Sequence, residues 1–412
     1  MFGAPLPLDG VRILDMGRLF AAPFATQMLG DFGAEVFKIE RPGRGDEFRH
    51  YGPPWLIDEM GNPSPAAPEA PGYVSVNRNK YSLAIDFQIA EGAALIRDLA
   101  RKCDVFVENY KVGTLARYGL DYDTIRALNP NVIYLSITGF GQTGPYAPRP
   151  GTDIVFQSMS GLMSVTGEPD GPPVRSGIVM ADMVTGFYAV SAILAALRAR
   201  EVQGHGGQFI DLALLDSTVS VMTAKAAEYF MTGTAPHRTG NRITGSVPAQ
   251  IFECADGLIN CQASADPDFV RLCDVLGITE VAADPRFVKR ADRAINADLL
   301  IPLLAVRFAE RHVTELYEAL VAASIIAAPI YSLDQTFADP QVKHRGLSTK
   351  VQHAHAGEIE ILTNPVRFHG EPLTAYRAPP TLGQDTEAGL TRILGVDAGE
   401  IGRLRRLGAI AT

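Results

Sequence analysis

Residues 11–39 read VRILDMGRLFAAPFATQMLGDFGAEVFKI and contain two apolar runs on either side of a helical pattern. The apolar runs, residues 11–16 and 35–39, have the length and composition of buried strands. Between them, Phe24 and Met28 lie four residues apart, as residues on one face of a helix do. Because a strand, a helix and a second strand in this order form a parallel βαβ unit, the segment predicts an α/β fold.

The same alternation of patterns continues beyond this first unit. Strands are expected at residues 81–87, 105–108, 132–137 and 209–214. Helices are expected over residues 93–103 and 217–230, with a final helix over residues 386–394. Strands separated by helical patterns favour a parallel, doubly wound sheet, so we expect a Rossmann-like large domain. At 412 residues the chain exceeds the roughly 250 to 300 at which one core stops growing, which favours a second domain. The hairpin signal Ala255-Asp256-Gly257 indicates a smaller α/β domain there.

The composition limits the classes of partner. Asp and Glu outnumber Lys and Arg by 46 to 37, a net charge of -9, which disfavours nonspecific binding to nucleic acid or an anionic membrane. No uninterrupted apolar run approaches the ~18 residues of a membrane span, and the first residues do not resemble a signal peptide. We therefore expect a cytoplasmic protein with buried, reduced thiols. The four cysteines are Cys103, Cys254, Cys261 and Cys273.

Asp182 stands where a turn-rich segment, residues 151–173, leads to the apolar helical pattern of residues 187–197. Arg200 and Gly204 are ordinary signals for the end of a helix, so this helix is expected to start near Asp182. An acid at a helix start is most often an N-cap that accepts hydrogen bonds from free amides. The alternative is a reactive carboxylate, and the residues alone favour the cap.

Several motifs that usually carry chemistry are absent or incomplete. Residues 139–144 spell G-x-G-x-x-G after a predicted strand, but three prolines follow at once, which disfavours a nicotinamide cofactor. No histidine has the spacing of a metal site, and we interpret His353 and His355 as surface residues. No metal site is therefore expected. The G-x-S-x-G motif of a nucleophile elbow is also absent.

Two loops have alternative interpretations. Residues 41–46 contain two arginines and two glycines at the carboxyl end of a predicted strand, where α/β sheets bind ligands, yet a solvated turn has the same composition. Residues 51–72 contain six prolines, which excludes a regular helix or a paired strand. Such a long loop is either a lid that selects the substrate or a plain insertion.

Short motifs in a fixed order resemble those of the class III (family III) coenzyme A transferases, the family of formyl-CoA and carnitine-CoA transferases. Each motif is weak alone, but the ordered set is specific and covers nearly the whole chain. The motifs are Ile13-Leu14-Asp15, Ala21-Ala22-Pro23, Gly33-Ala34-Glu35-Val36, Lys38-Ile39-Glu40, Asn77-Arg78-Asn79-Lys80, Val107-Glu108-Asn109-Tyr110, Leu128-Asn129-Pro130, Thr138-Gly139-Phe140-Gly141, residues 166–173, Ala181-Asp182, Ala328-Pro329-Ile330, Phe337-Ala338-Asp339-Pro340 and Pro379-Pro380-Thr381-Leu382-Gly383.

The resemblance implies an acyl-CoA:carboxylate CoA-transferase with Asp182 as the nucleophile. The reaction would pass through an aspartyl anhydride and an aspartyl-CoA thioester, which requires neither a metal nor a histidine base. The substrates would be an acyl-CoA donor, for which succinyl-CoA is a reasonable guess, and a small carboxylic acid acceptor, with no tightly bound cofactor. By similarity, the residues that contact coenzyme A would be Phe20, Ala21, Arg41, Lys80, Asn109, Tyr110, Arg117 and Thr152.

The resemblance also implies an interlocked homodimer and a division of the chain. We expect residues 1–225 to form the first part of the large domain, residues 226–328 the small domain, and residues 329–412 a segment that returns to the large domain. Two alternatives are an α-methylacyl-CoA racemase and a CoA-binding protein without catalysis. The racemases place a catalytic histidine where this chain has Thr152, which disfavours racemisation. Formyl-CoA transferase has a polyglycine loop near residues 238–247, and this chain lacks it.

Overall fold

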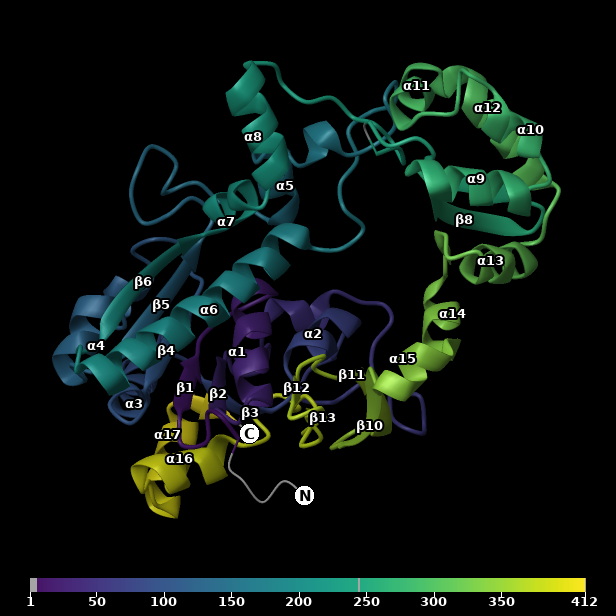
Figure 1. Ribbon diagram of the computed structural model, residues 1–412. Helices are drawn as coiled ribbons and strands as arrows, with labels where there is room; N and C mark the ends of the chain where they lie inside the picture. Colours follow the sequence, from purple (N-terminus) through teal and green to yellow (C-terminus); the bar gives the residue numbers. More distant parts are fainter. Residues whose placement is uncertain (1–5, 244, 412) are drawn as a thin grey trace. The chain divides into compact units, whose positions relative to one another are not determined.

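The computed structural model describes residues 6–243 and 245–411 (Figure 1). The chain forms two compact units. The first unit contains the residues up to Leu162, Ser176–Ala224, and the residues from Arg345 onwards. The second unit contains Met163–Arg175 and Lys225–His344.

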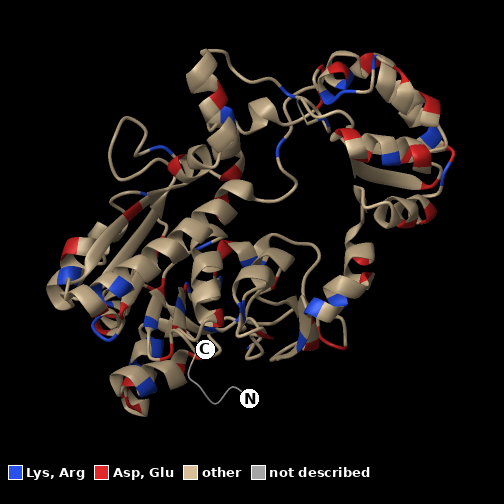
Figure 2. Cartoon of the chain, in the orientation of Figure 1, with Lys and Arg blue, Asp and Glu red and all other residues tan. Residues whose placement is uncertain are grey.

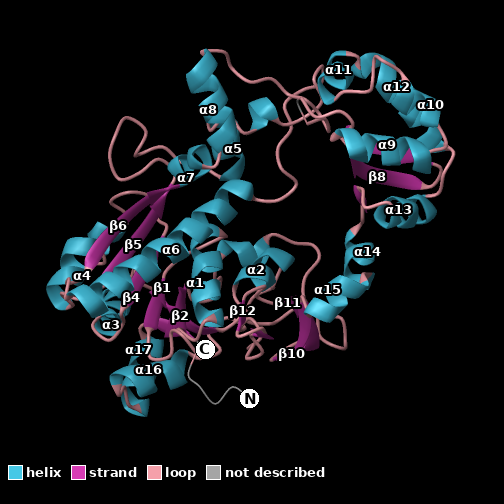
Figure 3. Ribbon diagram, in the orientation of Figure 1, coloured by secondary structure: helices cyan, strands magenta, loops and turns pink. Residues whose placement is uncertain are grey.

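The first unit is built on a seven-stranded sheet of order β14-β3-β2-β1-β4-β5-β6 (Figure 3). The strands β1 to β6 are parallel, and β14 pairs with β3 in the antiparallel direction. The order 3-2-1-4-5-6 is that of doubly wound dinucleotide-binding sheets. The expected α/β class with a mostly parallel sheet is therefore confirmed. The strands are β1 (Arg12–Asp15), β2 (Glu35–Glu40), β3 (Lys80–Ile85), β4 (Val105–Glu108), β5 (Ile133–Thr138), β6 (Gln208–Ala213) and β14 (Ile410–Ala411).

Helices cover both faces of this sheet. Because successive strand residues point to opposite faces, Ile13 packs in one hydrophobic core and Leu14 in the other. The Ile13 core contains residues of α1 and α6, which run across the same face (Figure 1). Burial on both faces explains the continuous apolar runs in the sequence. The helices of this unit are α1 (Ala21–Asp31), α2 (Pro71–Val76), α3 (Ala90–Ala100), α4 (Tyr122–Leu128), α5 (Asp153–Met159), α6 (Met180–Gln203), α7 (Leu214–Ser220), α16 (Thr386–Leu394) and α17 (Ala398–Arg406).

The strand order reverses between β1 and β4, which are neighbours in the sheet. Ligands of doubly wound sheets bind at this reversal, outside the carboxyl ends of the strands. Here those ends are Asp15 and Glu108, and the loops that follow them are residues 16–20 and 109–114. The topology alone therefore points to these two loops.

α6 is the longest helix among the described residues, with 24 residues. By length and composition it could cross a membrane, and Figure 2 shows few charged residues along it. In this structure it packs against α1 and contributes Ala189, Ile193 and Leu197 to the hydrophobic core of the unit. A core helix of a globular unit has the same properties.

Two sequence expectations for helices were wrong. The helix expected over residues 217–230 is two helices, α7 and α8 (Thr223–Thr232). The hydroxyls of Ser217, Thr218 and Ser220 donate to backbone carbonyls in α7, and such bonds compete with regular helix pairing. The helix expected to be the last one, α16, is followed by α17 and β14.

The second unit has a three-stranded antiparallel sheet of order β7-β8-β9. The predicted hairpin is confirmed, because β7 and β8 pair across the turn at Ala255 and Asp256. All four cysteines of the chain are buried and free, as expected. The elements of this unit are β7 (Ala249–Cys254), β8 (Gly257–Gln262), α9 (Asp266–Val275), α10 (Thr279–Ala283), α11 (Arg290–Ile295), α12 (Ala297–Ala309), α13 (Val313–Ala322), β9 (Ile326–Pro329), α14 (Leu333–Ala338) and α15 (Pro340–Arg345).

Between α15 and α16 the first unit has two short antiparallel pairs. They are β10 (Ser348–His353) with β11 (Gly357–Leu362), and β12 (Arg367–Phe368) with β13 (Glu371–Pro372). β11 contacts α2, so this hairpin packs beside the end of the proline-rich segment.

Candidate active site

A cavity of about 380 Å³ lies in the first unit at the reversal of strand order. Its walls come from the loops after β1, β4 and β5 and from the starts of α1, α5 and α6. Six of the residues predicted from the sequence line this cavity together. They are Phe20, Ala21, Asn109, Tyr110, Thr152 and Asp182.

Asp182 is the third residue of α6, which begins at Met180 with Val179 as its N-cap. The cap interaction comes from Asp153, the first residue of α5. Its Oδ1 accepts hydrogen bonds from the amides of Ala181 at 2.8 Å and Asp182 at 3.4 Å. The interpretation of Asp182 as the cap is therefore wrong, because Asp153 satisfies the helix amides in its place.

The Asp182 carboxylate has no hydrogen-bond or ion-pair partner within residues 6–243 and 245–411. Burial against the cavity wall, and next the charge of Asp153, raise the pKa of Asp182 to about 7. Both causes disfavour the ionised form, since it loses hydration and faces a like charge. Asp182 is thus an unpaired carboxylate that titrates near neutrality, which is the behaviour of a functional group more than of a structural one.

Arg18 lines this cavity and a second one, and it was not predicted from the sequence. Its amide donates to Asn109 Oδ1 at 2.9 Å, and Asn109 Nδ2 donates back to the carbonyl of Arg18 at 2.7 Å. Its guanidinium lies 4.1 Å from the centre of the Tyr110 ring and 2.9 Å from Glu47. A cation directly after the first strand, at a carboxyl end of the sheet, was the signal that could have found it.

The second cavity has a volume of about 180 Å³ and contains Arg41, one of the predicted residues. Arg18 and Tyr110 line both cavities, so the two cavities are neighbours. Arg44 also lines the second cavity. Residues 41–46 were expected to be either a ligand-binding loop or a solvated turn. The position of Arg41 and Arg44 in the lining of a cavity at the carboxyl edge of the sheet favours the ligand-binding loop.

Lys80 was expected to contact coenzyme A, and the structure corrects this expectation. Lys80 lines neither cavity and is fully buried. Its ammonium donates to Asp15 Oδ2 at 2.9 Å, to the carbonyl of Pro23 at 2.8 Å and to Asn77 Oδ1 at 3.0 Å. These three acceptors use all three of its donors, so none remains for a phosphate. Burial lowers its pKa to about 8. Arg117 also lies outside both cavities, and its side chain is exposed in the 3₁₀ turn Leu115–Tyr118.

Within the proline-rich segment, residues 51–72, only Tyr51 lines the cavity that holds Asp182, and Phe48 lines it just before the segment. The end of the segment is fixed, because Glu69 is buried and pairs with Arg49 at 2.9 Å and with His353 Nε2 at 3.0 Å. His353 is therefore buried and not the surface residue expected, and its Nδ1 accepts from two backbone amides.

No cluster of three or more His, Cys, Asp or Glu side chains suited to a metal ion occurs in the part of the chain that the structure describes. The candidate site consists of one unpaired carboxylate, a neighbouring carboxylate that caps its helix, and cations that line the neighbouring cavity.

Comparison with known proteins gives the following relatives. The family described as CoA-transferase family III matches residues 8–386. The succinate–glutarate CoA-transferase of Agrobacterium fabrum is 40% identical over 378 residues, which cover 92% of this chain and 93% of that protein. The succinyl-CoA:glutarate CoA-transferase of Mus musculus is 40% identical over 404 residues, 98% of this chain and 90% of that protein. The crystal structure of a CAIB/BAIF family protein from Brucella suis superposes with a TM-score of 0.87 at 38% identity, covering 95% of this chain and 100% of that one.

Proposed function

Since this chain belongs to CoA-transferase family III and is a CoA-transferase, we propose that it transfers coenzyme A through covalent intermediates on Asp182. The observation that carries this proposal is the Asp182 carboxylate itself, which is unpaired among the described residues and lies in a cavity at the carboxyl edge of the sheet. Its two neighbours in that cavity, Thr152 and Asp153, belong to the start of α5.

The proposed reaction has four steps that balance without a metal or a proton donor. A carboxylate oxygen of Asp182 attacks the thioester carbonyl of the donor, the C–S bond breaks, and CoA thiolate leaves an aspartyl anhydride. The thiolate attacks Cγ of Asp182, releasing the donor acid and forming an aspartyl-CoA thioester. The acceptor carboxylate then attacks Cγ and displaces the thiolate. Finally the thiolate attacks the acceptor carbonyl, which releases the new acyl-CoA and the Asp182 carboxylate.

The environment of Asp182 favours the first step. Its ionised form is destabilised by burial and by Asp153, as the pKa of about 7 indicates. The anhydride and the thioester carry no charge on this side chain, so their formation relieves both penalties. The capping bond to Ala181 keeps Asp153 in place while the charge on Asp182 changes.

The two neighbouring cavities support binding of a long acyl-CoA. Arg41 and Arg44 in the second cavity supply the charge that phosphate groups require. Two buried atoms of residues that line the second cavity, Arg18 Nε and Glu47 Oε2, have no hydrogen-bond partner among the described residues. One is a donor and the other an acceptor, which suits an amide group such as those of the pantetheine arm.

We propose dicarboxylic acids as the acyl groups exchanged, with succinyl-CoA as a donor. Two relatives that are 40% identical are named for succinate or succinyl-CoA together with glutarate. The Asp182 cavity also contains Arg149, which could pair with a second carboxylate of such a substrate. Arg149 packs over the ring of Tyr146 at 3.8 Å.

We further propose a cytoplasmic homodimer. Phe187 and Tyr188 in α6 expose 52% and 43% of their surface, and Phe187 lies one turn beyond Asp182. Large apolar side chains exposed beside a site are typical of a surface that a second subunit covers. The acidic net charge gives no support for binding to nucleic acid.

Trapping of the intermediate tests the proposed function. The protein is incubated with succinyl-CoA, quenched with hydroxylamine, and mapped by mass spectrometry. A hydroxamate on Asp182 is expected, and Asp182→Asn serves as the control that cannot form it. Full activity with an unmodified Asp182 would refute the covalent route.

A further inference from the structure

Five backbone groups of the turn between β1 and α1, residues 17–19, bond to side chains, and four of these bonds come from other segments. The Gly17 amide donates to Asp15 Oδ1 at 2.7 Å, and the Gly17 carbonyl accepts from Lys38 Nζ at 2.8 Å. Asn109 bonds both the amide and the carbonyl of Arg18. The Leu19 amide donates to Asp46 Oδ1 at 3.0 Å. Lys38, Asn109 and Asp46, which belong to three other segments, therefore impose the conformation of this turn.

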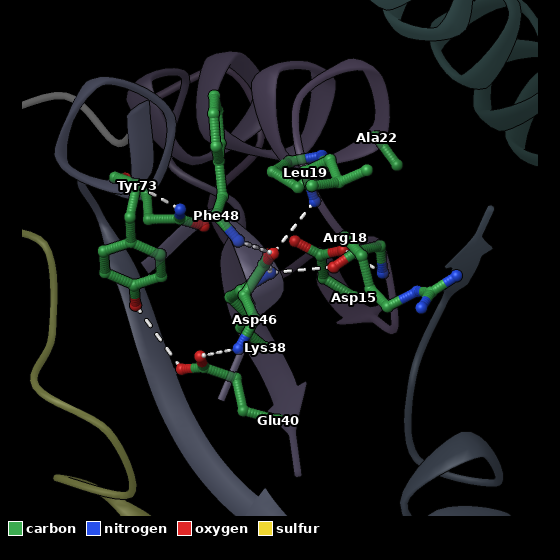
Figure 4. A network of polar contacts seen from close by, with 12 residues as sticks. Asp15, Arg18, Leu19, Ala22, Lys38, Glu40, Asp46, Phe48 and Tyr73 are labelled. Carbon is green, nitrogen blue, oxygen red and sulfur yellow. Dashed lines mark hydrogen bonds and ion pairs between the residues drawn. The ribbon is translucent and has the colours of Figure 1, made fainter. Parts of the chain in front are cut away.

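Leu19 is the strained residue of this turn. Its φ is 61°, in the left-handed region that residues with a Cβ rarely adopt. Such strain persists where surrounding structure imposes it, and it is concentrated at functional sites. Figure 4 shows the carboxylate of Asp46 directed at the amide of Leu19, with Lys38 on its other side.

Asp46 and Lys38 act on the turn as a pair. Lys38 Nζ contacts Asp46 Oδ2 at 2.8 Å, and both side chains are buried. Together they bond the carbonyl of Gly17 and the amide of Leu19, the two ends of the turn. Asp46 itself is fixed, because its amide donates to Glu40 Oε2 at 3.0 Å. A buried pair held on all sides transmits position better than a flexible surface contact.

The turn determines where α1 begins, and the start of α1 faces Asp182. Phe20 and Ala21 line the cavity with Asp182. A Cβ at Gly186, one helical turn after Asp182 on the same side of α6, would lie 3.2 Å from the carbonyl of Ala21 and 2.7 Å from the ring of Phe24. The two helices therefore approach each other closely one turn after the proposed nucleophile, and a shift of the turn would move one wall of its cavity.

We propose that Asp46 is a positioning residue for CoA transfer, acting through the left-handed conformation of Leu19 on the wall of the cavity opposite Asp182. This rests on the proposed function of that cavity. Asp46 touches no reacting atom. It keeps Phe20 and Ala21 in their positions beside α6.

The first test compares Asp46→Ala with a matched variant, Asp31→Ala. Asp31 is also a buried carboxylate paired with a cation, Arg78, but it is the last residue of α1, at the opposite end from the turn. Both variants are expected to lower the melting temperature. Asp46→Ala is expected to lower kcat with the acyl-CoA donor about 100-fold, since misplacement by about 1 Å has such an effect. Asp31→Ala is expected to retain kcat. Equal losses of kcat in the two variants would overturn the proposal.

The second test varies Leu19 and leaves the buried charges intact. Gly and Asn tolerate a positive φ, whereas Val does not. Leu19→Gly and Leu19→Asn are therefore expected to retain more kcat than Leu19→Val, although Val preserves the apolar character. In the Asp46→Ala protein, Leu19→Gly is expected to restore kcat roughly fivefold. The opposite order, with Val the most active, would mean that the side chain of Leu19 matters and the backbone does not.

The conservative variant Asp46→Asn completes the design, because its Oδ1 can still accept from Leu19 and Phe48. It is expected to have a kcat between those of the native protein and Asp46→Ala.

The hydroxylamine trap separates this inference from the proposed function. If the native protein forms no Asp182 adduct, the proposed function fails. If the adduct forms in Asp46→Ala at the native rate, the positioning role fails.

Discussion

Asp153 caps the helix that carries Asp182, with its Oδ1 2.8 Å from the amide nitrogen of Ala181 and 3.4 Å from that of Asp182 itself. One carboxylate is thus used to fix the start of α6, and its charge raises the pKa of the other. Asp153 is fixed in turn by Gln157, whose Nε2 donates to Oδ2 at 2.6 Å. Structure and electrostatics at the site therefore depend on the same side chain.

The pH dependence of activity should follow the ionisation of Asp182. Because the nucleophile is the carboxylate, kcat/KM for the donor is expected to rise with pH and to level off above a pKa of about 7. A pH profile between 5.5 and 8.5, roughly spanning that value, measures it. Activity that stays constant over that range would contradict the raised pKa.

Asp153→Asn should shift that profile to lower pH. The amide oxygen can still accept from Ala181, while the loss of charge removes the second cause of the raised pKa. Because burial is the larger cause, the shift is expected to be roughly one pH unit or less. Gln157→Ala is the matched control, since it loosens Asp153 without removing its charge. An unchanged midpoint in Asp153→Asn would show that the charge of Asp153 does not raise the pKa of Asp182.

Asp182→Asn should lose activity and gain stability. Loss of the nucleophile is expected to lower kcat roughly 10⁴-fold or more. The folded pKa of Asp182, about 7, lies above its ordinary value of 3.8, so its ionisation opposes folding as pH rises between these values. The variant should therefore be more stable than the native protein at pH 8 by on the order of 2 to 4 kcal/mol, and equal to it near pH 4. Thermal unfolding at the two pH values measures this difference, and an equal difference at both would contradict it.

Arg41→Ala should weaken substrate binding, whereas Lys80→Ala should destabilise the fold. Arg41 lines the second cavity, so its loss is expected to raise KM for the acyl-CoA about tenfold with little change in melting temperature. Removal of Lys80 leaves Asp15 buried and unpaired, which is expected to cost about 3 to 5 kcal/mol of folding free energy. Melting temperatures and KM values for both variants measure the contrast. A stable Lys80→Ala with a raised KM would restore Lys80 to the binding residues.

Two deletions in the proline-rich segment should also differ. Residues 63–68 include Ala67, which packs with Ala84 and Leu382, so their removal is expected to destabilise the protein. Residues 58–61 form an exposed tip, and their removal is expected to leave stability and acceptor specificity unchanged. Activity of the tip deletion on a panel of carboxylic acids measures this. A changed acceptor preference would support the lid interpretation of the segment.

The sequence predicted the elements whose patterns are local. Every parallel strand followed from a short apolar run, and the helix with Asp182 near its start followed from the spacing of apolar residues and from Gly204. The helix α17 was missed, because two glycines and three arginines leave Ile401 and Leu404 as its buried apolar residues. Its stability comes from packing on the sheet, which a local pattern does not contain.

Some residues of the site were predicted from the sequence and others were not, because the roles of the latter depend on tertiary contacts. Lysine is usually exposed, so nothing local indicated that Lys80 begins a buried strand with Asp15 as its partner. The cap from Asp153 to α6 joins residues 28 positions apart and depends on the packing of two helices. The binding roles of the other residues and the division into domains stay predictions.

The short strand β14 has a consequence for how the protein is made. Ile410 pairs with Ile85, so the edge of β3 is covered by residues that are synthesised more than 300 positions after it. Until they emerge from the ribosome, β3 offers an open row of amides and carbonyls to other nascent chains. We expect the pairing of β14 with β3 to end this period of aggregation risk. A bulky tag inserted directly after β14 is expected to lower the yield of folded protein.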